Sequence, residues 1–175
     1  MSEPLIVFVC TANVCRSPWA ELRAKQLLPG FAVGSGATLS STAGRPMDDV
    51  MAATLPDGVE VAGHRAKPLS AAMAREASLI LTMEERHRAW VLDEFPGAIR
   101  KTFTVGQFAA TVSRAPEGLP LDELLLWAYR NRVPSSGTDI SDPYRQGAER
   151  AAETAELLDR LLAQMAPVLV QAVGT

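Results

Sequence analysis

The residues best suited to catalysis lie together near the N-terminus, where 10–18 reads Cys-Thr-Ala-Asn-Val-Cys-Arg-Ser-Pro. A cysteine thiolate is a strong nucleophile, and the planar fork of an arginine matches two oxygens of a tetrahedral oxyanion. The Cys-x5-Arg spacing therefore indicates that Cys10 attacks phosphorus while Arg16 holds the phosphate. The hydroxyl of Ser17 is expected to hydrogen-bond the thiolate and stabilise it as a leaving group.

The segments on either side of this loop are those that create an anion site. The apolar, β-branched run 5–9 predicts a strand buried on both faces. A helix should follow, with Ser17 as its N-cap, Pro18 in its first turn and an end at 29–30. A loop between a strand and a helix directs backbone N–H groups and the helix dipole at one point. The predicted phosphate-binding loop is Thr11, Ala12, Asn13, Val14, Cys15, Arg16 and Ser17.

The rest of the chain alternates strand-like and helix-like segments. Further strands are expected around 38–42, at 79–83 and at 100–104. Helices are expected at 46–55, 70–76, 84–92 and 104–114, around 121–128, and from about 146, with Pro167 kinking or ending the last one. Residues 134–143 read as a loop. This alternation predicts one α/β domain over 1–175, built on a parallel sheet whose ligands bind at the carboxyl ends of the strands.

Composition excludes several classes of function. The 175 residues carry a net charge of −3, so no broad basic field attracts nucleic acid or an anionic membrane. No apolar run approaches the roughly 20 residues of a spanning helix, and no signal peptide is evident. Cys10 and Cys15 are too few and too close for a disulfide framework. We expect a cytoplasmic protein without nucleic-acid or membrane partners.

Cys-x5-Arg-Ser-Pro, together with Asp-Pro-Tyr at 142–144, resembles the low-molecular-weight protein tyrosine phosphatases. The resemblance extends to 41–44, 64–66 and 79–83 and thins between about 105 and 140. It implies a single-domain three-layer sandwich with a four-stranded parallel sheet flanked by helices. It also implies a phosphocysteine intermediate, with no metal and no cofactor.

The resemblance assigns the catalytic roles to particular residues. It makes Cys10 the nucleophile, Arg16 the phosphate clamp and Asp142 the general acid and base. The residues support the last role independently, because an aryl phosphate needs a proton on its leaving oxygen and water needs a base in the second step. One carboxylate can serve both steps.

The resemblance also implies supporting roles around the loop. Asn13 holds the loop in shape, often in a left-handed conformation that asparagine tolerates, and His64 buttresses it. Cys15 matches a second cysteine able to form a reversible disulfide with the nucleophile. Tyr144 is expected as an aromatic wall of the substrate pocket, and Met47 as a further pocket residue.

The sequence departs from the family pattern at several positions. Ala12 stands where the family usually has glycine, and its methyl would crowd the loop if the residue needed a positive φ. The stretch after Gly44 is shorter than in the family and leads almost directly into residues 45–47, which removes part of a substrate-facing wall. Arg145 follows Tyr144 where a second aromatic is common, and the expanded segment 105–140 is expected to add a lid or a partner surface.

Three functions are compatible with these residues. The leading hypothesis is hydrolysis of phosphotyrosine in proteins, or of small aryl phosphates. The second is arsenate reduction with a small external thiol, since no cysteine lies outside the loop. The third is a non-catalytic phosphate-binding or redox-sensing module, against which Asp142 argues because binding alone needs no acid. The sequence carries no signal for the oligomeric state.

Overall fold

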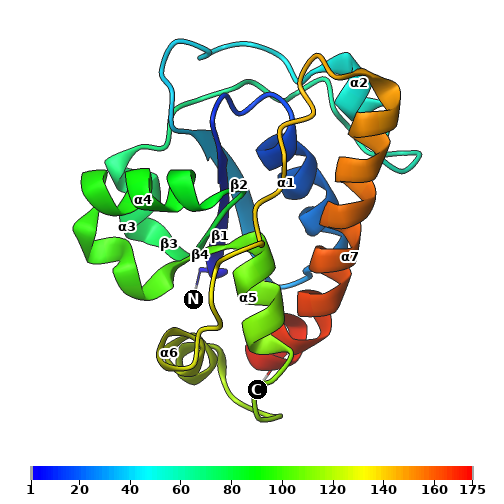
Figure 1. Ribbon diagram of the computed structural model, residues 1–175. Helices are drawn as coiled ribbons and strands as arrows, with labels where there is room; N and C mark the ends of the chain where they lie inside the picture. The colour runs from blue at the N-terminus through cyan, green and yellow to red at the C-terminus, as the bar shows by residue number, and fades with distance from the viewer. Residues whose placement is uncertain (1, 175) are drawn as a thin grey trace.

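The computed structural model describes residues 2–174 and is built on one sheet of four parallel strands in the order β2-β1-β3-β4 (Figure 1). The strands are β1 (Leu5–Cys10), β2 (Ala32–Ala37), β3 (Ala77–Thr82) and β4 (Thr102–Thr104). β1 lies at the centre and pairs with both β2 and β3. The predicted four-stranded parallel sheet flanked by helices is confirmed.

Helices cover both faces of the sheet (Figure 1). One face carries α1 (Arg16–Leu27), α5 (Val105–Val112) and α7 (Gly147–Gly174). The other carries α3 (Ala71–Glu76), α4 (Glu85–Glu94) and the 3₁₀ segment η1 (Pro96–Lys101). The short α2 (Asp49–Ala52) contacts α1 and α7, and α6 (Leu121–Arg130) contacts η1, α5 and α7. The result is the expected three-layer arrangement.

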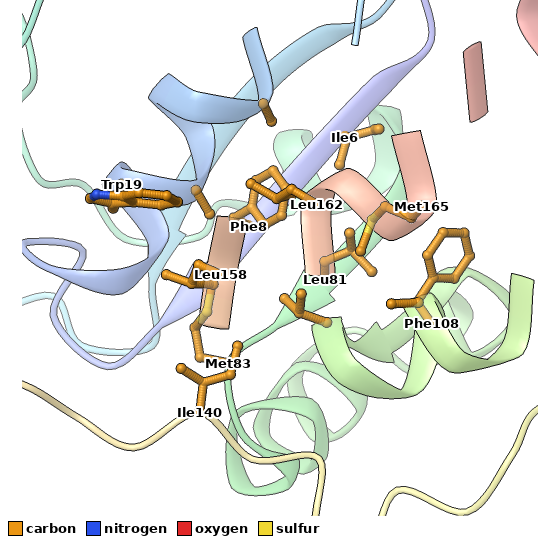
Figure 2. Packing of buried hydrophobic residues seen from close by; sticks show 14 of the residues in the cluster. Ile6, Phe8, Trp19, Leu81, Met83, Phe108, Ile140, Leu158, Leu162 and Met165 are labelled. Atoms are coloured by element: carbon orange, nitrogen blue, oxygen red, sulfur yellow. The ribbon is translucent and has the colours of Figure 1, made fainter. Parts of the chain in front are cut away.

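The core explains why β1 is apolar without interruption. Successive strand side chains point to opposite faces, so Ile6 and Phe8 join the core under α1 and α7, whereas Val7 and Val9 join the core under α3 and α4. All four are fully buried. Figure 2 shows the larger core, in which Ile6, Phe8 and Leu81 of the sheet face the α7 side chains Leu158, Leu162 and Met165. A strand buried on both faces holds the loop that follows it rigidly.

The second strand lies earlier than the predicted segment 38–42. Gly34 and Gly36 weaken the sequence signal of β2, because glycine has a low strand propensity. The sheet nevertheless requires Gly36, since a Cβ there would lie 3.0 Å from the Cα of Leu69. The pairing of β2 along the whole of β1 and this close backbone approach outweigh the local propensity.

The last helix does not end at Pro167 but continues to Gly174, so an end at that proline was wrong. Proline removes one backbone hydrogen bond, but Leu169 and Ala172 beyond it are buried and keep the final turns on the core. Among residues 2–174, α7 is the one helix long and apolar enough to cross a membrane by length and composition, with a mean hydropathy of 1.2. A third of that apolar window is buried, and the buried apolar residues of α7 belong to the larger core.

Candidate active site

The loop between β1 and α1 has its carbonyl groups turned outward. The carbonyls of residues 10–15 accept hydrogen bonds, in order, from Thr38 N (2.9 Å), Leu39 N (3.0 Å), Thr42 Oγ1 (2.8 Å), His64 Nε2 (2.8 Å), Asp48 N (2.8 Å) and Trp19 N (3.2 Å). Across a trans peptide bond, a carbonyl and the next N–H point in opposite directions. The N–H groups of residues 11–16 therefore face the inside of the loop, where they form an anion-binding cradle.

Cys10 lies at the base of this cradle and is 3% exposed. The backbone N–H of Asn13 donates to Cys10 Sγ at 3.3 Å, and Ser17 Oγ lies 3.0 Å from the same sulfur. Once Cys10 is a thiolate, the hydroxyl of Ser17 must be the donor of that bond. Both contacts direct a hydrogen-bond donor at the nucleophilic sulfur.

Ser17 does not cap α1, which corrects the sequence interpretation. The helix begins at Arg16, and Cys15 is its N-cap without a side-chain cap bond. Ser17 is in the first turn, and helical side chains point back toward the N-terminus, so its Oγ reaches Cys10 instead of a backbone N–H. A serine followed by proline gives the same local signal in either position.

Asn13 fixes the shape of the loop. It is fully buried and has a φ of 56°. Its side-chain amide donates to Ser17 Oγ and Ser35 Oγ, both at 2.8 Å, and its Oδ1 accepts from Lys67 N at 3.1 Å. Asn13 and Arg145 are the non-glycine residues with positive φ within 2–174, so Ala12 is not strained and its methyl does not crowd the loop in the way anticipated.

Arg16 is buried beside the loop, and its Nε is a buried donor without a partner among the described residues. Its side chain is 1% exposed, and Nη1 donates to Glu84 Oε1 and to the carbonyl of Ile140, both at 2.5 Å. Arg16 Nε has no hydrogen-bond partner among residues 2–174. Buried polar groups are almost always paired, so this N–H is a donor awaiting an acceptor such as a phosphate oxygen.

A pocket of about 240 Å³ opens above the loop. Its lining consists of Cys10, Thr11, Ala12, Val14, Cys15, Arg16, Thr42, Arg45, Asp142 and Tyr144. Asp142 Oδ2 lies 3.6 Å from Arg16 Nη2, and its side chain is 45% exposed. Ile140 holds the segment that carries Asp142 in place, because the N–H of Ile140 donates to the carbonyl of Met83 at 2.9 Å. Met47 does not line the pocket; it is 4% exposed and belongs to the core.

Tyr144 forms one wall of the pocket and is held by two arginines. Arg45 Nη2 donates to the Tyr144 hydroxyl at 3.0 Å and its guanidinium lies 5.7 Å from the ring centroid. Arg145 lies 5.1 Å from the same centroid. The hydrogen bond from Arg45 lowers the pKa of the Tyr144 phenol below its ordinary value.

Cys15 differs electrostatically from Cys10. It is 3% exposed, and burial, together with the nearby carboxylates Asp48 and Asp142, raises the pKa of its thiol far above the ordinary range. Cys15 is therefore a neutral thiol at physiological pH. The reversible disulfide with Cys10 that the family resemblance implies for Cys15 would exist only in the oxidised protein, and it remains a prediction.

Several residues of the site were not assigned a role by the sequence interpretation. Glu84 accepts from both Arg16 and Arg86, and these bonds outweigh partial burial and lower the pKa of its carboxyl group to about 2. Ser35 donates to Glu21 Oε2 at 2.5 Å while accepting from Asn13. The one sequence signal that could have marked Glu84 as a site residue is its position, because it follows the carboxyl end of a strand of the parallel sheet, where ligands bind.

His87 connects this carboxylate to the loop. It is 2% exposed; its Nδ1 accepts from the N–H of Glu84 at 3.2 Å, so Nε2 carries the proton and donates to Thr11 Oγ1 at 2.8 Å. Burial, followed by the charge of Arg16, lowers the pKa of His87 to about 4. The imidazole is thus neutral at pH 7 and acts as a fixed donor to the loop.

Because His87 is neutral in the folded protein, we expect the free energy of unfolding to fall in mild acid. Between pH 6.5 and 4, histidine in the unfolded chain binds a proton that folded His87 does not accept, so the free energy of unfolding falls as the pH falls. For one proton the slope is at most about 1.4 kcal/mol per pH unit. Urea denaturation of the wild type and His87→Gln should give a stability difference that is constant above pH 7 and shrinks below pH 6.5. A difference that is constant down to pH 4.5 would contradict the prediction.

Comparison with known proteins agrees with this geometry. A family model described as low molecular weight phosphotyrosine protein phosphatase matches residues 5–120. The low molecular weight protein-tyrosine-phosphatase Wzb of Salmonella typhi is 31% identical over 165 residues, covering 94% of this chain and 93% of that protein. The structure of Vibrio vulnificus Wzb in complex with benzylphosphonate is similar, with a TM-score of 0.72, 26% identity and coverage of 95% and 99% of the two chains. So is the YwlE arginine phosphatase from Geobacillus stearothermophilus, with a TM-score of 0.73, 28% identity and coverage of 94% and 91%.

Proposed function

The chain belongs to the low-molecular-weight protein tyrosine phosphatase family, and we propose that it hydrolyses phosphotyrosine in proteins, or small aryl phosphates, through a phosphocysteine on Cys10. The observation that carries the proposal is a single pocket containing a thiol, the inward N–H groups of the loop, a buried Arg16 with an unpaired donor, and Asp142. Each group has a use in phosphoryl transfer.

In the first step, the loop N–H groups and Arg16 bind the phosphate oxygens. Cys10 Sγ attacks phosphorus in line with the ester oxygen; the S–P bond forms as the P–O bond to the phenol breaks. Protonated Asp142 gives its proton to the departing oxygen, so that a neutral phenol leaves. The contact between Asp142 and Arg16 keeps the carboxyl group beside the phosphate.

In the second step, Asp142 is a carboxylate and takes a proton from water. The water oxygen attacks phosphorus, the P–S bond breaks, and inorganic phosphate is released. Cys10 leaves as a thiolate, which the N–H of Asn13 and the hydroxyl of Ser17 stabilise at 3.3 Å and 3.0 Å. No metal is needed for either step, because Arg16 and the loop supply the positive charge.

The pocket favours an aromatic ester over the alternatives. The ring of Tyr144 offers a wall for an aryl group, whereas Arg45 at the mouth would repel the guanidinium of a phosphoarginine substrate. The relatives named above are phosphatases, which does not favour arsenate reduction.

We also propose one domain over 1–175, since α6 and α7 share the core of the sheet. A cytoplasmic location follows from the need to keep Cys10 reduced.

The Asp142→Asn variant tests the role of the acid. We expect kcat/KM for phenyl phosphate, which reports only the first step, to fall by about 10²-fold or more, because phenolate is a poor leaving group without a proton. The loss should be several-fold smaller for p-nitrophenyl phosphate, whose leaving group is stable as an anion. Asp139→Asn is the matched control, since that carboxylate accepts from Glu85 N instead of lining the pocket. Equal losses of kcat/KM on both substrates would contradict proton donation to the leaving group.

A further inference from the structure

We propose that Arg45 and Arg145 make this enzyme select phosphotyrosine with acidic residues beside it in the substrate peptide. The inference rests on the proposed function, because the phosphotyrosine must occupy the Cys10 pocket for its neighbours to reach these arginines. It adds a substrate class to that function, namely acidic phosphopeptides.

The two arginines are held in place at the mouth of the pocket. Arg45 lines the pocket, donates to the Tyr144 hydroxyl at 3.0 Å and lies against its ring; Arg145 lies against the same ring at 5.1 Å. Both residues are exposed. Stacking on an aromatic ring restricts a long side chain before substrate arrives, so less conformational entropy is lost on binding.

Their charges are not neutralised by the protein. Neither Arg45 nor Arg145 forms an ion pair within the described residues 2–174. Of the carboxylates around the pocket, Asp142 and Glu84 lie beside Arg16. Asp48 accepts from the N–H of Met51 at 3.0 Å and acts on Arg45 only through its charge, without an ion pair. In a chain with a net charge of −3, this mouth is a local concentration of unpaired positive charge.

The opposite side of the pocket does not share this property. Arg86 Nη2 lies 3.2 Å from Thr11 Oγ1, but Arg86 also pairs with Glu84 at 2.8 Å. This ion pair holds the guanidinium of Arg86 against a carboxylate of the protein, a contact that neither Arg45 nor Arg145 makes among the described residues. The selection should therefore come from the Tyr144 side, through Arg45 and Arg145.

A bound peptide can bring carboxylates to this side. Residues of an extended chain are about 3.3 Å apart, so an Asp or Glu within a few positions of the phosphotyrosine reaches the rim while the phosphate stays in the loop. Ion pairs at an exposed rim are individually weak. We therefore expect a preference of about 5- to 10-fold in kcat/KM, which high salt should reduce.

The experiment compares three phosphotyrosine peptides that are identical except for Asp/Glu, Asn/Gln or Lys at the flanking positions. The wild type should show the highest kcat/KM on the acidic peptide. Arg45→Gln/Arg145→Gln should bring the acidic-to-neutral ratio close to one, and Arg145→Glu should shift the preference toward the lysine peptide. The matched control is Arg114→Gln, which replaces an exposed arginine just after the C-terminal end of α5 and should keep the wild-type ratio.

The ratio is informative even where a variant changes overall activity, since loss of structure would lower turnover of all three peptides together. An equal kcat/KM of the wild type on the acidic and neutral peptides, or an unchanged ratio in the double variant, would overturn the inference while leaving the phosphatase intact. If the wild type hydrolyses no aryl phosphate at all, the proposed function fails, and the inference fails with it.

Discussion

Cys10→Ser is expected to reduce kcat for p-nitrophenyl phosphate by more than about 10⁴-fold, the largest effect of any single substitution in this chain. The loop stabilises a thiolate through the N–H of Asn13 and the hydroxyl of Ser17. A serine hydroxyl at the same position stays protonated at neutral pH, and the site places no base beside it. The measurement is steady-state turnover, with circular dichroism to show that the variant is folded.

Phosphate binding separates loss of the nucleophile from loss of the site. The loop N–H groups and Arg16 remain in Cys10→Ser, so inorganic phosphate should still raise its thermal midpoint, as in the wild type. In the wild type, phosphate should also slow alkylation of Cys10 by iodoacetate. A serine variant with wild-type turnover would rule out the phosphocysteine mechanism. Phosphate binding by a wild type that turns over no ester would instead favour the non-catalytic alternative.

The position of the loop could be predicted from sequence because the pattern that marks it is local. The apolar run of β1, the Cys-x5-Arg spacing and the helix that follows are all contained in residues 5–27. The same holds for the caps of α3 and α5, where Ser70 Oγ and Thr104 Oγ1 accept from Met73 N and Gln107 N, although not for the predicted cap of α1 at Ser17. In such segments the bonding partner lies within a few positions, so one stretch of sequence specifies it.

The remaining features depend on contacts between distant segments. Glu84 and Ile140 meet Arg16 across 68 and 124 positions of sequence, and no periodicity encodes such a pairing. Met47 is expected in the pocket, but its apolar side chain lies in the core instead, where burial of an apolar group stabilises the fold. The early β2 has a similar cause, since the close approach of Leu69 to Gly36 is visible only in three dimensions.

Arg16→Lys is expected to lower kcat/KM for p-nitrophenyl phosphate by about 10³-fold, because catalysis depends on a donor fixed toward the phosphate. The guanidinium bonds Glu84 and Ile140 through Nη1 and still has Nε unpaired. A lysine has a single nitrogen and cannot bond these two acceptors and also reach a phosphate with the geometry of a fork. The Ki of inorganic phosphate should therefore rise in parallel with the loss of kcat/KM.

Arg23→Lys provides the matched control for this prediction. Arg23 lies in the same helix, is partly buried and donates through Nε to Asp159 at 2.6 Å, away from the pocket. Its replacement tests whether an arginine in α1 matters only for folding, and kcat/KM should change by less than about twofold, as expected for a partly exposed ion pair. Urea denaturation of both variants measures their free energies of unfolding, so that a loss of stability can be compared with the loss of kcat/KM. If Arg16→Lys kept activity within tenfold of the wild type, the buried guanidinium would be a structural partner of Glu84 and not the phosphate clamp.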